Sequence, residues 1–290
     1  MPELPEVETI RLGLQKYLVG HTIESVKVNL SKMMQGDTRH IVGEKVIGVR
    51  RFGKGLVIDG NNGYSIAAHI KLTGQFIYSD PHVAKHVRLS QDKVGRVPNK
   101  WTHVIFTLDN HAVLYYNDLR QFGWIKIVKT EDVSSLPFFK DLGPEFPALP
   151  KTTRQQPLLT LDNFRTIVQK GSGPIKPLLM DQKKMSGIGN IYANDGLFDA
   201  GIDPRRKAKS LSEDQIKRLY ESLLKVLKKG LEYRGATELN FVDALGEEGE
   251  YQKHFLVYSR AKKPCRVCGT PIQKFKLAGR GTYFCPACQR

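Results

Sequence analysis

The sequence predicts an α+β protein of two domains, in which a β-sandwich or barrel with an N-terminal helix is followed by a helical domain and a zinc ribbon. Three observations support this. Short apolar stretches of strand length, separated by turn residues, recur from residue 21 to about 128. From residue 154 the apolar spacing becomes helical. All four cysteines fall in the last 26 residues of a 290-residue chain, which is long enough for two hydrophobic cores.

The first residues carry a candidate nucleophile. Methionine before Pro2 is normally removed, which leaves a secondary amine with a pKa of about 7.7 to 8. Such an amine attacks an electrophilic carbon and forms a cationic iminium without losing a further proton. Glu3 is close enough to exchange a proton with the attacked group. The alternative is that Pro2 and Pro5 only begin a helix, and both hold if apolar residues at helical spacing form one from about residue 5.

Strands are expected over 22–30, 46–49, 56–58, 64–70, 75–78, 104–108, 112–116 and 124–128. Gly60-Asn61-Asn62-Gly63 and Asp109-Asn110 are expected to be turns between them. Four prolines over residues 131–153 predict an irregular linker between the domains.

Beyond the linker, helices are expected over 164–169, 175–182, 191–200 and 212–231. The last begins with Ser212-x-x-Gln215, a capping box. Glycines in the 185–190 turn expose backbone N–H groups at a helix start, which favours a helix-turn-helix that binds phosphate. An ordinary helical hairpin remains the alternative. Polar residues 237–254 are typical of a mobile loop, either functional or without a role.

The cysteines predict one structural zinc ion. Cys265-x-x-Cys268 and Cys285-x-x-Cys288 have the spacing of a zinc ribbon, and four thiolates leave no open position for catalysis. Between the pairs, residues 275–284 predict a hairpin with Gly279 and Gly281 at its tip. Arg280 lies between these glycines, where a guanidinium can bind a phosphate; a solvated turn arginine is the alternative.

The charge balance favours a polyanionic partner. The chain has 45 Lys and Arg against 29 Asp and Glu, a net charge of +16, which is typical of nucleic-acid binding. A membrane surface is disfavoured, because no polybasic run accompanies an amphipathic helix. With no signal peptide and no long apolar stretch, a cytoplasmic protein is expected.

The chain contains Pro2-Glu3-Leu4-Pro5-Glu6-Val7-Glu8-Thr9, Gly187-Ile188-Gly189-Asn190-Ile191-Tyr192-Ala193 and the terminal cysteine pairs. Together these three motifs resemble the formamidopyrimidine-DNA glycosylase family (Fpg) of bacterial base-excision repair. The resemblance spans nearly the whole chain and implies a catalytic β-sandwich domain (1–130), a linker (131–153), a helix-two-turns-helix DNA-binding domain (154–236), a lesion-recognition loop and connector (237–260) and a zinc finger (261–290). It also implies a bacterial monomer, located in the cytoplasm and on the nucleoid, that acts on damaged double-stranded DNA.

The resemblance implies excision of 8-oxoguanine and formamidopyrimidines. Pro2 would attack C1′ and displace the base, and β- and δ-elimination would follow, with Glu3 as acid and base. Lys54 and Arg280 match family residues linked to β- and δ-elimination respectively, and Asn190 matches one that binds the same phosphates.

Base excision requires the base to leave the stack, and the resemblance assigns residues to fill the gap. Arg120 would pair with the orphaned cytosine, while Phe122 and Leu72 would insert into the stack. His69, His103 and Lys170 are further candidates for DNA contact.

Departures from the family pattern affect the expected lesion spectrum. Leu72 replaces the usual Met, Gln121 replaces an Arg, and Trp101 replaces a His. The related endonuclease VIII branch removes oxidised pyrimidines instead, but Leu4 and the intact Arg120-x-Phe122 favour the Fpg branch. A zinc-ribbon DNA-binding protein without catalysis is the remaining alternative, and the Pro2 amine beside Glu3 argues against it.

Overall fold

The structure, a computed structural model, describes residues 1–83, 89–148 and 156–290. These form two compact units, Met1–Lys140 with Leu231–Gln252, and Asp141–Gly230 with Lys253–Arg290. The predicted mixture of helix and sheet is confirmed. Residues 231–252 belong to the same unit as the N-terminal segment. The chain returns to the first unit at this point, whereas the domains expected from the sequence follow one another without a return.

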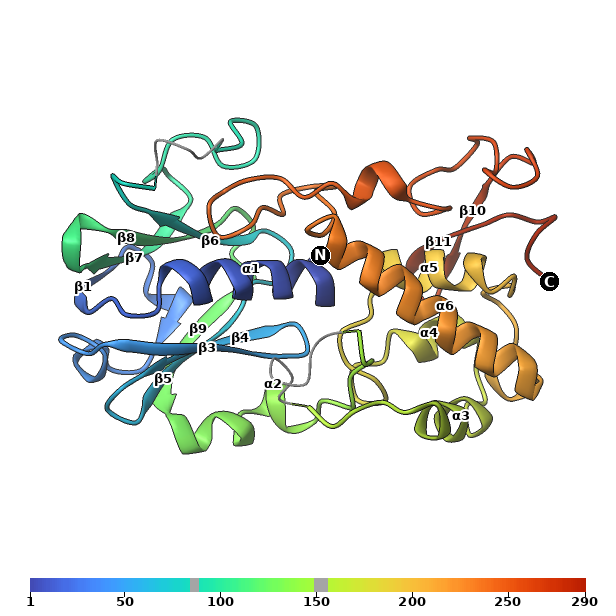
Figure 1. Ribbon diagram of the computed structural model, residues 1–290, viewed down its shortest axis with the longest axis horizontal. Coiled ribbons are helices and arrows are strands. Elements are labelled where there is room, and N and C mark those ends of the chain that lie inside the picture. The colour runs from blue at the N-terminus through green and yellow to red at the C-terminus, as the bar shows by residue number, and fades with distance from the viewer. Residues whose placement is uncertain (84–88, 149–155) are drawn as a thin grey trace. The chain divides into compact units, whose positions relative to one another are not determined.

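The first unit is a sandwich of two sheets (Figure 1). The four-stranded sheet has the order β1-β7-β8-β6, with β1 Ile23–Val28, β6 Gly74–Ser79, β7 Thr102–Leu108 and β8 Val113–Asp118. The five-stranded sheet has the order β2-β9-β5-β4-β3, with β2 Met34–Gln35, β3 Val46–Phe52, β4 Gly55–Gly60, β5 Tyr64–His69 and β9 Trp124–Lys129. Every predicted strand is present. β2 was missed because two residues are too few to show an alternating pattern.

Helix α1, Leu4–Tyr17, closes one side of the sandwich. It contacts β3, β4 and β6, and β3 and β6 are edge strands of the two sheets, so the helix covers both edges (Figure 1). Its core face is fully buried, and each large apolar side chain there contributes about 1.5–3 kcal/mol. The helix that directly follows Pro2 and Glu3 is therefore fixed to the main core of this unit.

Residues 237–254, predicted to be a mobile loop, are packed at their centre. Phe241 is 5% exposed and Ala244 is fully buried, and both belong to the sandwich core. The N–H of Tyr78 donates to the carbonyl of Ala244 at 2.7 Å. The polar composition of this segment concealed these apolar anchors, and a short 3-10 helix, Tyr251–His254, ends it.

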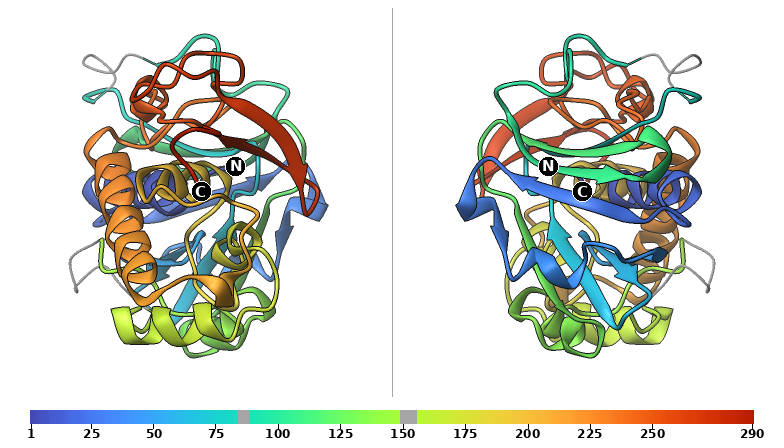
Figure 2. Two further views of the ribbon diagram at one scale, coloured as in Figure 1. Left: turned by 90° about the vertical axis from the view of Figure 1, so that its right-hand side faces the viewer. Right: turned by 90° about the vertical axis from the view of Figure 1, so that its left-hand side faces the viewer.

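The second unit contains the predicted helices and hairpin. Figure 2 (left) shows them from the right-hand side of Figure 1. They are α3 Leu161–Gln169, α4 Ile175–Leu179, α5 Asn190–Asp199, α6 Glu213–Glu232, β10 Gln273–Leu277 and β11 Arg280–Phe284. The capping box of α6 is confirmed, since the backbone N–H groups of Ser212 and Gln215 each donate to the other's side chain. Helix α4 is shorter than predicted, because Met180 and Asp181 already bond three residues back, as in a 3-10 turn.

The prediction that residues 131–153 contain no regular structure was wrong. A 3-10 helix, Thr130–Ser135, and helix α2, Pro137–Lys140, occupy the first part. Pro137 begins α2, a position where the missing N–H has no intrahelical partner to lose. Residues 149–153, with Pro150, lie outside the described residues.

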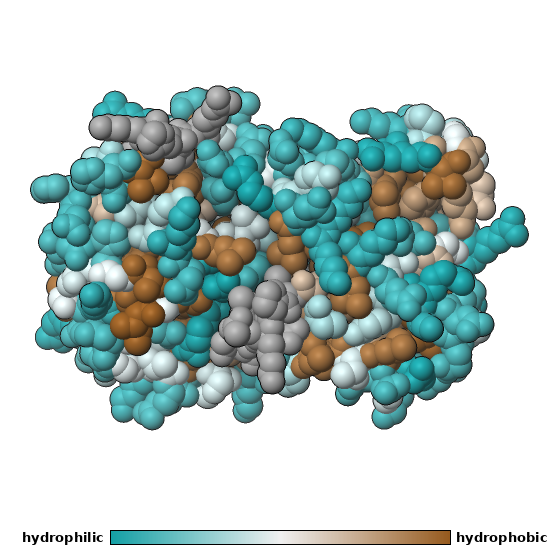
Figure 3. Space-filling model, in the orientation of Figure 1, coloured by the Kyte–Doolittle hydropathy of each residue, from teal (hydrophilic) through white to brown (hydrophobic). Residues whose placement is uncertain are grey.

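On the face drawn in Figure 3, hydrophilic residues surround separate hydrophobic patches. No helix in the described part of the chain is both long and apolar enough to cross a membrane.

Candidate active site and metal centre

The start of α1 holds Pro2 and Glu3 in buried positions. Glu3 is 2% exposed and lies just before the helix, where its N–H donates to Oε2 of Glu6 at 2.8 Å. The other oxygen of Glu6 accepts the N–H of Ala236 at 2.8 Å. One buried carboxylate thus joins the first turn of α1 to a residue of the segment 231–252. A side chain at Gly235 would come within 2.8 Å of Glu6 Cγ, and φ there is +80°, so the approach requires glycine.

Lys54 lies in the two-residue turn between β3 and β4, after Gly53 with φ of 56°. Lys54 is buried, with 3% of the residue exposed. Arg51 fixes the turn, because its Nη1 donates to the Gly53 carbonyl at 2.6 Å and its Nε donates to Glu8 at 2.9 Å. Since Glu8 belongs to α1, this buried ion pair joins the helix of Pro2 to the turn of Lys54.

His69, at the end of β5, lies near the same charges. It is 4% exposed, its ring meets the Phe138 ring edge-on at 4.4 Å, and its Nδ1 accepts the N–H of Lys71 at 2.9 Å. Burial, and then the charges of Lys71 and Lys54, lower the pKa of His69 to about 3. The ring is therefore neutral and works as an acceptor at physiological pH.

We expect His69 to make folding stability fall in mild acid. Its pKa is lower in the folded chain than in the unfolded chain, so its contribution is complete above about pH 6.5 and is lost as the pH falls toward 3. At pH 5 the loss is about 2 kcal/mol. His69→Gln keeps an acceptor for Lys71 but does not titrate, so its urea midpoint should change less between pH 7 and pH 5 than that of the unaltered chain. An equal change in both proteins would contradict this.

Asp118, the last residue of β8, organises the loop that carries Arg120 and Phe122. Its carboxylate is fully buried and accepts Thr73 Oγ1 at 2.5 Å, the Arg120 N–H at 3.2 Å and the Gly123 N–H at 2.8 Å. Thr73 Oγ1 also accepts the Arg120 N–H at 2.9 Å. Leu72 precedes Thr73, so one carboxylate fixes both segments predicted to enter the base stack.

The side chains of this loop face solvent. Phe122 is 54% exposed, and the Arg120 guanidinium lies 4.8 Å from its ring centroid. Leu72 is partly exposed, in a turn after β5. His103 is 5% exposed and its Nε2 donates to the Asp118 carbonyl at 2.9 Å, so its ring supports the loop from inside. The structure thus brings Leu72, Arg120 and Phe122 onto one supported surface.

In the second unit, Asn190 begins α5 and contacts the β10–β11 hairpin. Its Nδ2 donates to the Gly281 carbonyl at 3.0 Å. Lys176, only 1% exposed, donates to Asn190 Oδ1 at 2.7 Å, to the Gly281 carbonyl at 3.0 Å and to Thr282 Oγ1 at 2.8 Å. A buried ammonium therefore joins the helix start to the hairpin.

Arg280 is the exposed first residue of β11, paired with Leu277. The predicted hairpin tip was partly wrong, because the turn is Ala278-Gly279, whereas Gly281 lies within β11 opposite Lys276. Lys170 is exposed at the end of α3, and no hydrogen bond or ion pair among the described residues joins it to Asn190 or Arg280.

The four cysteines fit one zinc ion. Their Sγ atoms all lie within 4.8 Å of one another. Cys265 and Cys288 are 3.9 Å apart, and Cys268 and Cys285 are 3.5 Å apart. A tetrahedron with Zn–S bonds of about 2.3 Å has edges of about 3.8 Å, so the shell closes around one structural ion. The predicted metal centre is confirmed.

Asp118 and Lys176 escaped the sequence analysis, although both fix candidate site residues. A lone aspartate before a turn is usually interpreted as a turn residue, and a lone lysine early in a helix as a solvated charge. Neither pattern therefore indicated a functional role. Glu6 had a signal, since a glutamate three residues after the helix cap is the capping-box position.

Comparison with known proteins identifies three family regions along the chain. Residues 1–125 match the formamidopyrimidine-DNA glycosylase N-terminal domain, residues 152–241 its H2TH domain, and residues 262–290 the zinc finger found in FPG and IleRS. The chain is 39% identical to formamidopyrimidine-DNA glycosylase of Pelotomaculum thermopropionicum, over 100% of this chain and 99% of that protein.

Solved structures agree over the same length. The MutM (Fpg) protein of Thermus thermophilus has a TM-score of 0.84 and 33% identity, covering 99% of this chain and 98% of that one. A mutant of Lactococcus lactis Fpg, bound to DNA containing Fapy-dG, has a TM-score of 0.84 and 30% identity, with both chains covered completely. With the helix-two-turns-helix region, the sandwich and the cysteine cluster in place, the chain belongs to the formamidopyrimidine-DNA glycosylase family.

Proposed function

We propose that this chain is a bifunctional DNA glycosylase and abasic-site lyase that removes oxidised purines from duplex DNA. The observation that carries the proposal is the buried Pro2-Glu3 pair at the start of α1, fixed through Glu6 and joined through Glu8 to the turn of Lys54. The Lactococcus relative bound to Fapy-dG DNA supports the same lesion class. We further propose a cytoplasmic monomer.

Base removal starts once Met1 is absent and Pro2 carries an amine. The Pro2 nitrogen forms a bond to C1′, and the bond between C1′ and the base breaks, with the base leaving as it takes up a proton. Glu3 then protonates O4′, so that the sugar ring opens and the C1′–N bond becomes a cationic iminium. The positive charge makes the C2′ protons acidic, which prepares strand cleavage.

Strand cleavage follows by two eliminations. Loss of a C2′ proton expels the 3′ phosphate, and loss of a C4′ proton then expels the 5′ phosphate, leaving a one-nucleotide gap with a phosphate at each end. Lys54 assists the first step, and Arg280 and Asn190 bind the leaving phosphates. Lys176 serves as a positioning residue, because it fixes both Asn190 and the strand of Arg280.

Borohydride trapping on defined duplexes tests the proposal. We expect a stable protein–DNA crosslink with 8-oxoguanine opposite cytosine and with an abasic duplex, since borohydride reduces only an iminium. Preferential trapping on a thymine glycol duplex would instead support the pyrimidine-specific branch. A failure to crosslink with any duplex would refute covalent catalysis and leave a DNA-binding protein.

We expect Asp118→Asn to impair base excision selectively. An amide has one acceptor oxygen, so it cannot accept from both the Thr73 hydroxyl and the Gly123 N–H. The lost charged hydrogen bond of about 1.5–3 kcal/mol corresponds to roughly 10- to 100-fold. The single-turnover rate on an 8-oxoguanine duplex should fall, while cleavage of a single-stranded abasic oligonucleotide, which needs no stack insertion, should not. Asp109→Asn, at the far end of β7, is the control. Equal losses on both substrates would indicate a general folding defect and contradict the assignment.

We expect DNA affinity to fall steeply with salt. Each neutralised phosphate contributes a slope of about −0.9 in log K against log salt. Arg280→Gln should reduce that slope by about one. Arg39→Gln should not, because Arg39 is exposed but paired with Asp37. Fluorescence anisotropy between low and physiological salt checks this, and a flat dependence would contradict phosphate binding.

A further inference from the structure

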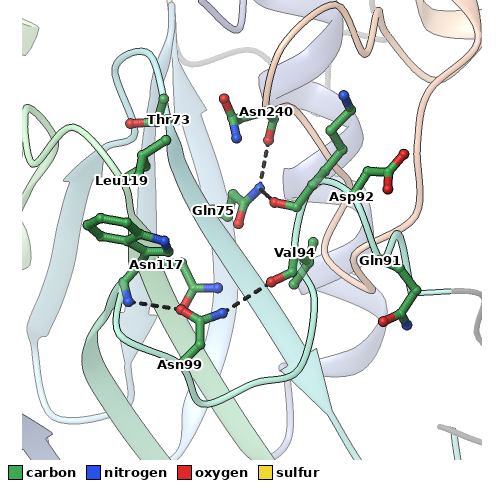
Figure 4. Close-up of a pocket in the computed structure, with 11 residues that line it drawn as sticks. Thr73, Gln75, Gln91, Asp92, Val94, Asn99, Asn117, Leu119 and Asn240 are labelled. Atoms are coloured by element: carbon green, nitrogen blue, oxygen red, sulfur yellow. Dashed lines mark hydrogen bonds between the residues drawn. The ribbon is translucent and has the colours of Figure 1, made fainter.

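A pocket of about 190 Å³ lies on the first unit, beside the loop of Arg120 (Figure 4). We call it the amide pocket; its lining includes Thr73, Gln75, Trp101, Asn117, Leu119 and Asn240. Gln75 on β6 and Asn117 on β8 are paired directly across the sheet. Their neighbours Phe76 and Tyr116 face the sandwich core, so the two amides face the opposite side. A single water needs only about 10–15 Å³, so the pocket admits a much larger group.

Two buried amides leave hydrogen-bonding groups unused in this pocket. Gln75 is 4% exposed, and its Nε2 donates to the carbonyls of Lys93 at 3.0 Å and Asn240 at 2.7 Å. Asn117 is 3% exposed, and its Oδ1 accepts Thr102 Oγ1 at 2.7 Å. Among the described residues, nothing donates to Gln75 Oε1 or accepts from Asn117 Nδ2. The pocket therefore offers one fixed acceptor and one fixed donor from adjacent strands (Figure 4).

One wall of the pocket is aromatic, and a cation outside the lining lies beside it. Trp101 is half-buried, and the ammonium of Lys100 lies 4.9 Å from its ring centroid. An aromatic face beside a cation is the usual arrangement for stacking an unpaired base while its phosphate stays near positive charge. A nucleotide matches these groups of the pocket. Its base is flat, so it can stack on the Trp101 ring, and it has donors and acceptors on one edge. Its phosphate is negative, which suits the nearby ammonium of Lys100.

We propose that the amide pocket binds an unstacked base of the strand opposite the lesion. Its lining residues Thr73 and Leu119 directly follow and precede Leu72 and Arg120, the residues expected to enter the stack. Neither Pro2 nor Glu3 lines the pocket, so a base held there is separate from the one that reacts. This inference rests on the proposed function, since it requires a duplex opened at the lesion.

Fluorescence with a single tryptophan tests the proposal. The chain has two tryptophans, so Trp124→Phe leaves Trp101 as the only one. This protein is mixed with duplexes that carry a tetrahydrofuran abasic analogue and 2-aminopurine at one position of either strand. We expect Trp101 quenching, and a change in 2-aminopurine emission at one position of the opposite strand only. A change confined to the damaged strand, or no Trp101 quenching, would overturn the proposal.

Substitutions in the pocket provide the matched comparison. Trp101→Leu should weaken binding of the opened duplex roughly 5- to 100-fold and abolish the 2-aminopurine signal, while Trp101→Phe should keep most of both. Asn117→Asp keeps the acceptor for Thr102 but removes the donor, so it should reduce the signal with the fold intact. Unchanged signals in Trp101→Leu and Asn117→Asp would refute the pocket.

Borohydride trapping on a single-stranded abasic oligonucleotide separates this inference from the proposed function. Trapping together with a silent 2-aminopurine duplex would contradict only the pocket. Absence of trapping in the unaltered chain would contradict the catalytic proposal itself.

Discussion

Replacing Pro2 with glycine is expected to lower the rate of base excision by at least about 100-fold. A misplacement of about 1 Å at a reacting atom can cost that factor, and glycine has no ring to fix its nitrogen. The primary amine of glycine must also keep an extra proton to reach the cationic state that the secondary amine reaches directly. Single-turnover excision of 8-oxoguanine measures the effect, and a residue added before Pro2 should have the same result by removing the amine.

Pro5→Ala is the matched control for Pro2→Gly. It removes a buried proline from the first turn of α1, three residues after Pro2, but no candidate nucleophile, and alanine is the best helix former. We expect its excision rate to stay within a few-fold of the unaltered chain. Full glycosylase activity in Pro2→Gly would refute the role given to the N-terminal amine.

Removal of a zinc ligand is expected to have the largest effect on structure. Cys285 is fully buried, and Cys285→Ala leaves three thiolates around the ion. Structural zinc contributes about 10–16 kcal/mol in zinc-finger peptides, so residues 262–290 should lose their fold. Because Lys176 and Asn190 both bond to Gly281, the loss should also disorganise the start of α5 and reduce DNA affinity. Metal content, limited proteolysis and anisotropy measure the three effects.

Val267→Ser is the control for the zinc site. Val267 lies between two ligands but is 76% exposed, so the substitution should leave one zinc per chain. A Cys285→Ala protein that kept its metal and resisted proteolysis in residues 262–290 would contradict the structural assignment.

Local patterns account for most of the fold that could be predicted. The strands of the sandwich, the helix from Leu4 and the capping box at Ser212 arise from neighbours in sequence, and so does the cysteine spacing. The mobile loop predicted around Phe241 is packed instead. Polar neighbours dominate the composition of this segment, and its hydrogen-bond partners lie far away in the sequence, in β6 and at Ser90.

The site could be predicted only where the residues themselves are chemically distinctive. The spacing of the cysteines has few other interpretations, and their prediction is confirmed. The roles of Pro2 and Glu3 stay predictions, which rest on an N-terminal amine beside a carboxylate. Asp118 acts on Thr73, 45 residues away, and Lys176 acts on Thr282, 106 residues away. Such contacts depend on the folded topology, and one sequence contains no trace of them.

The carboxylate of Glu6 has a consequence for the maturation of the chain. Its partner Ala236 is synthesised 230 residues later, so the first turn of α1 lacks this contact during most of translation. We therefore expect an aminopeptidase that acts on the nascent chain to reach Met1 before this contact exists. Once residues 231–252 have been synthesised and have folded, the hydrogen bond from Ala236 to Glu6 fixes the first turn of α1.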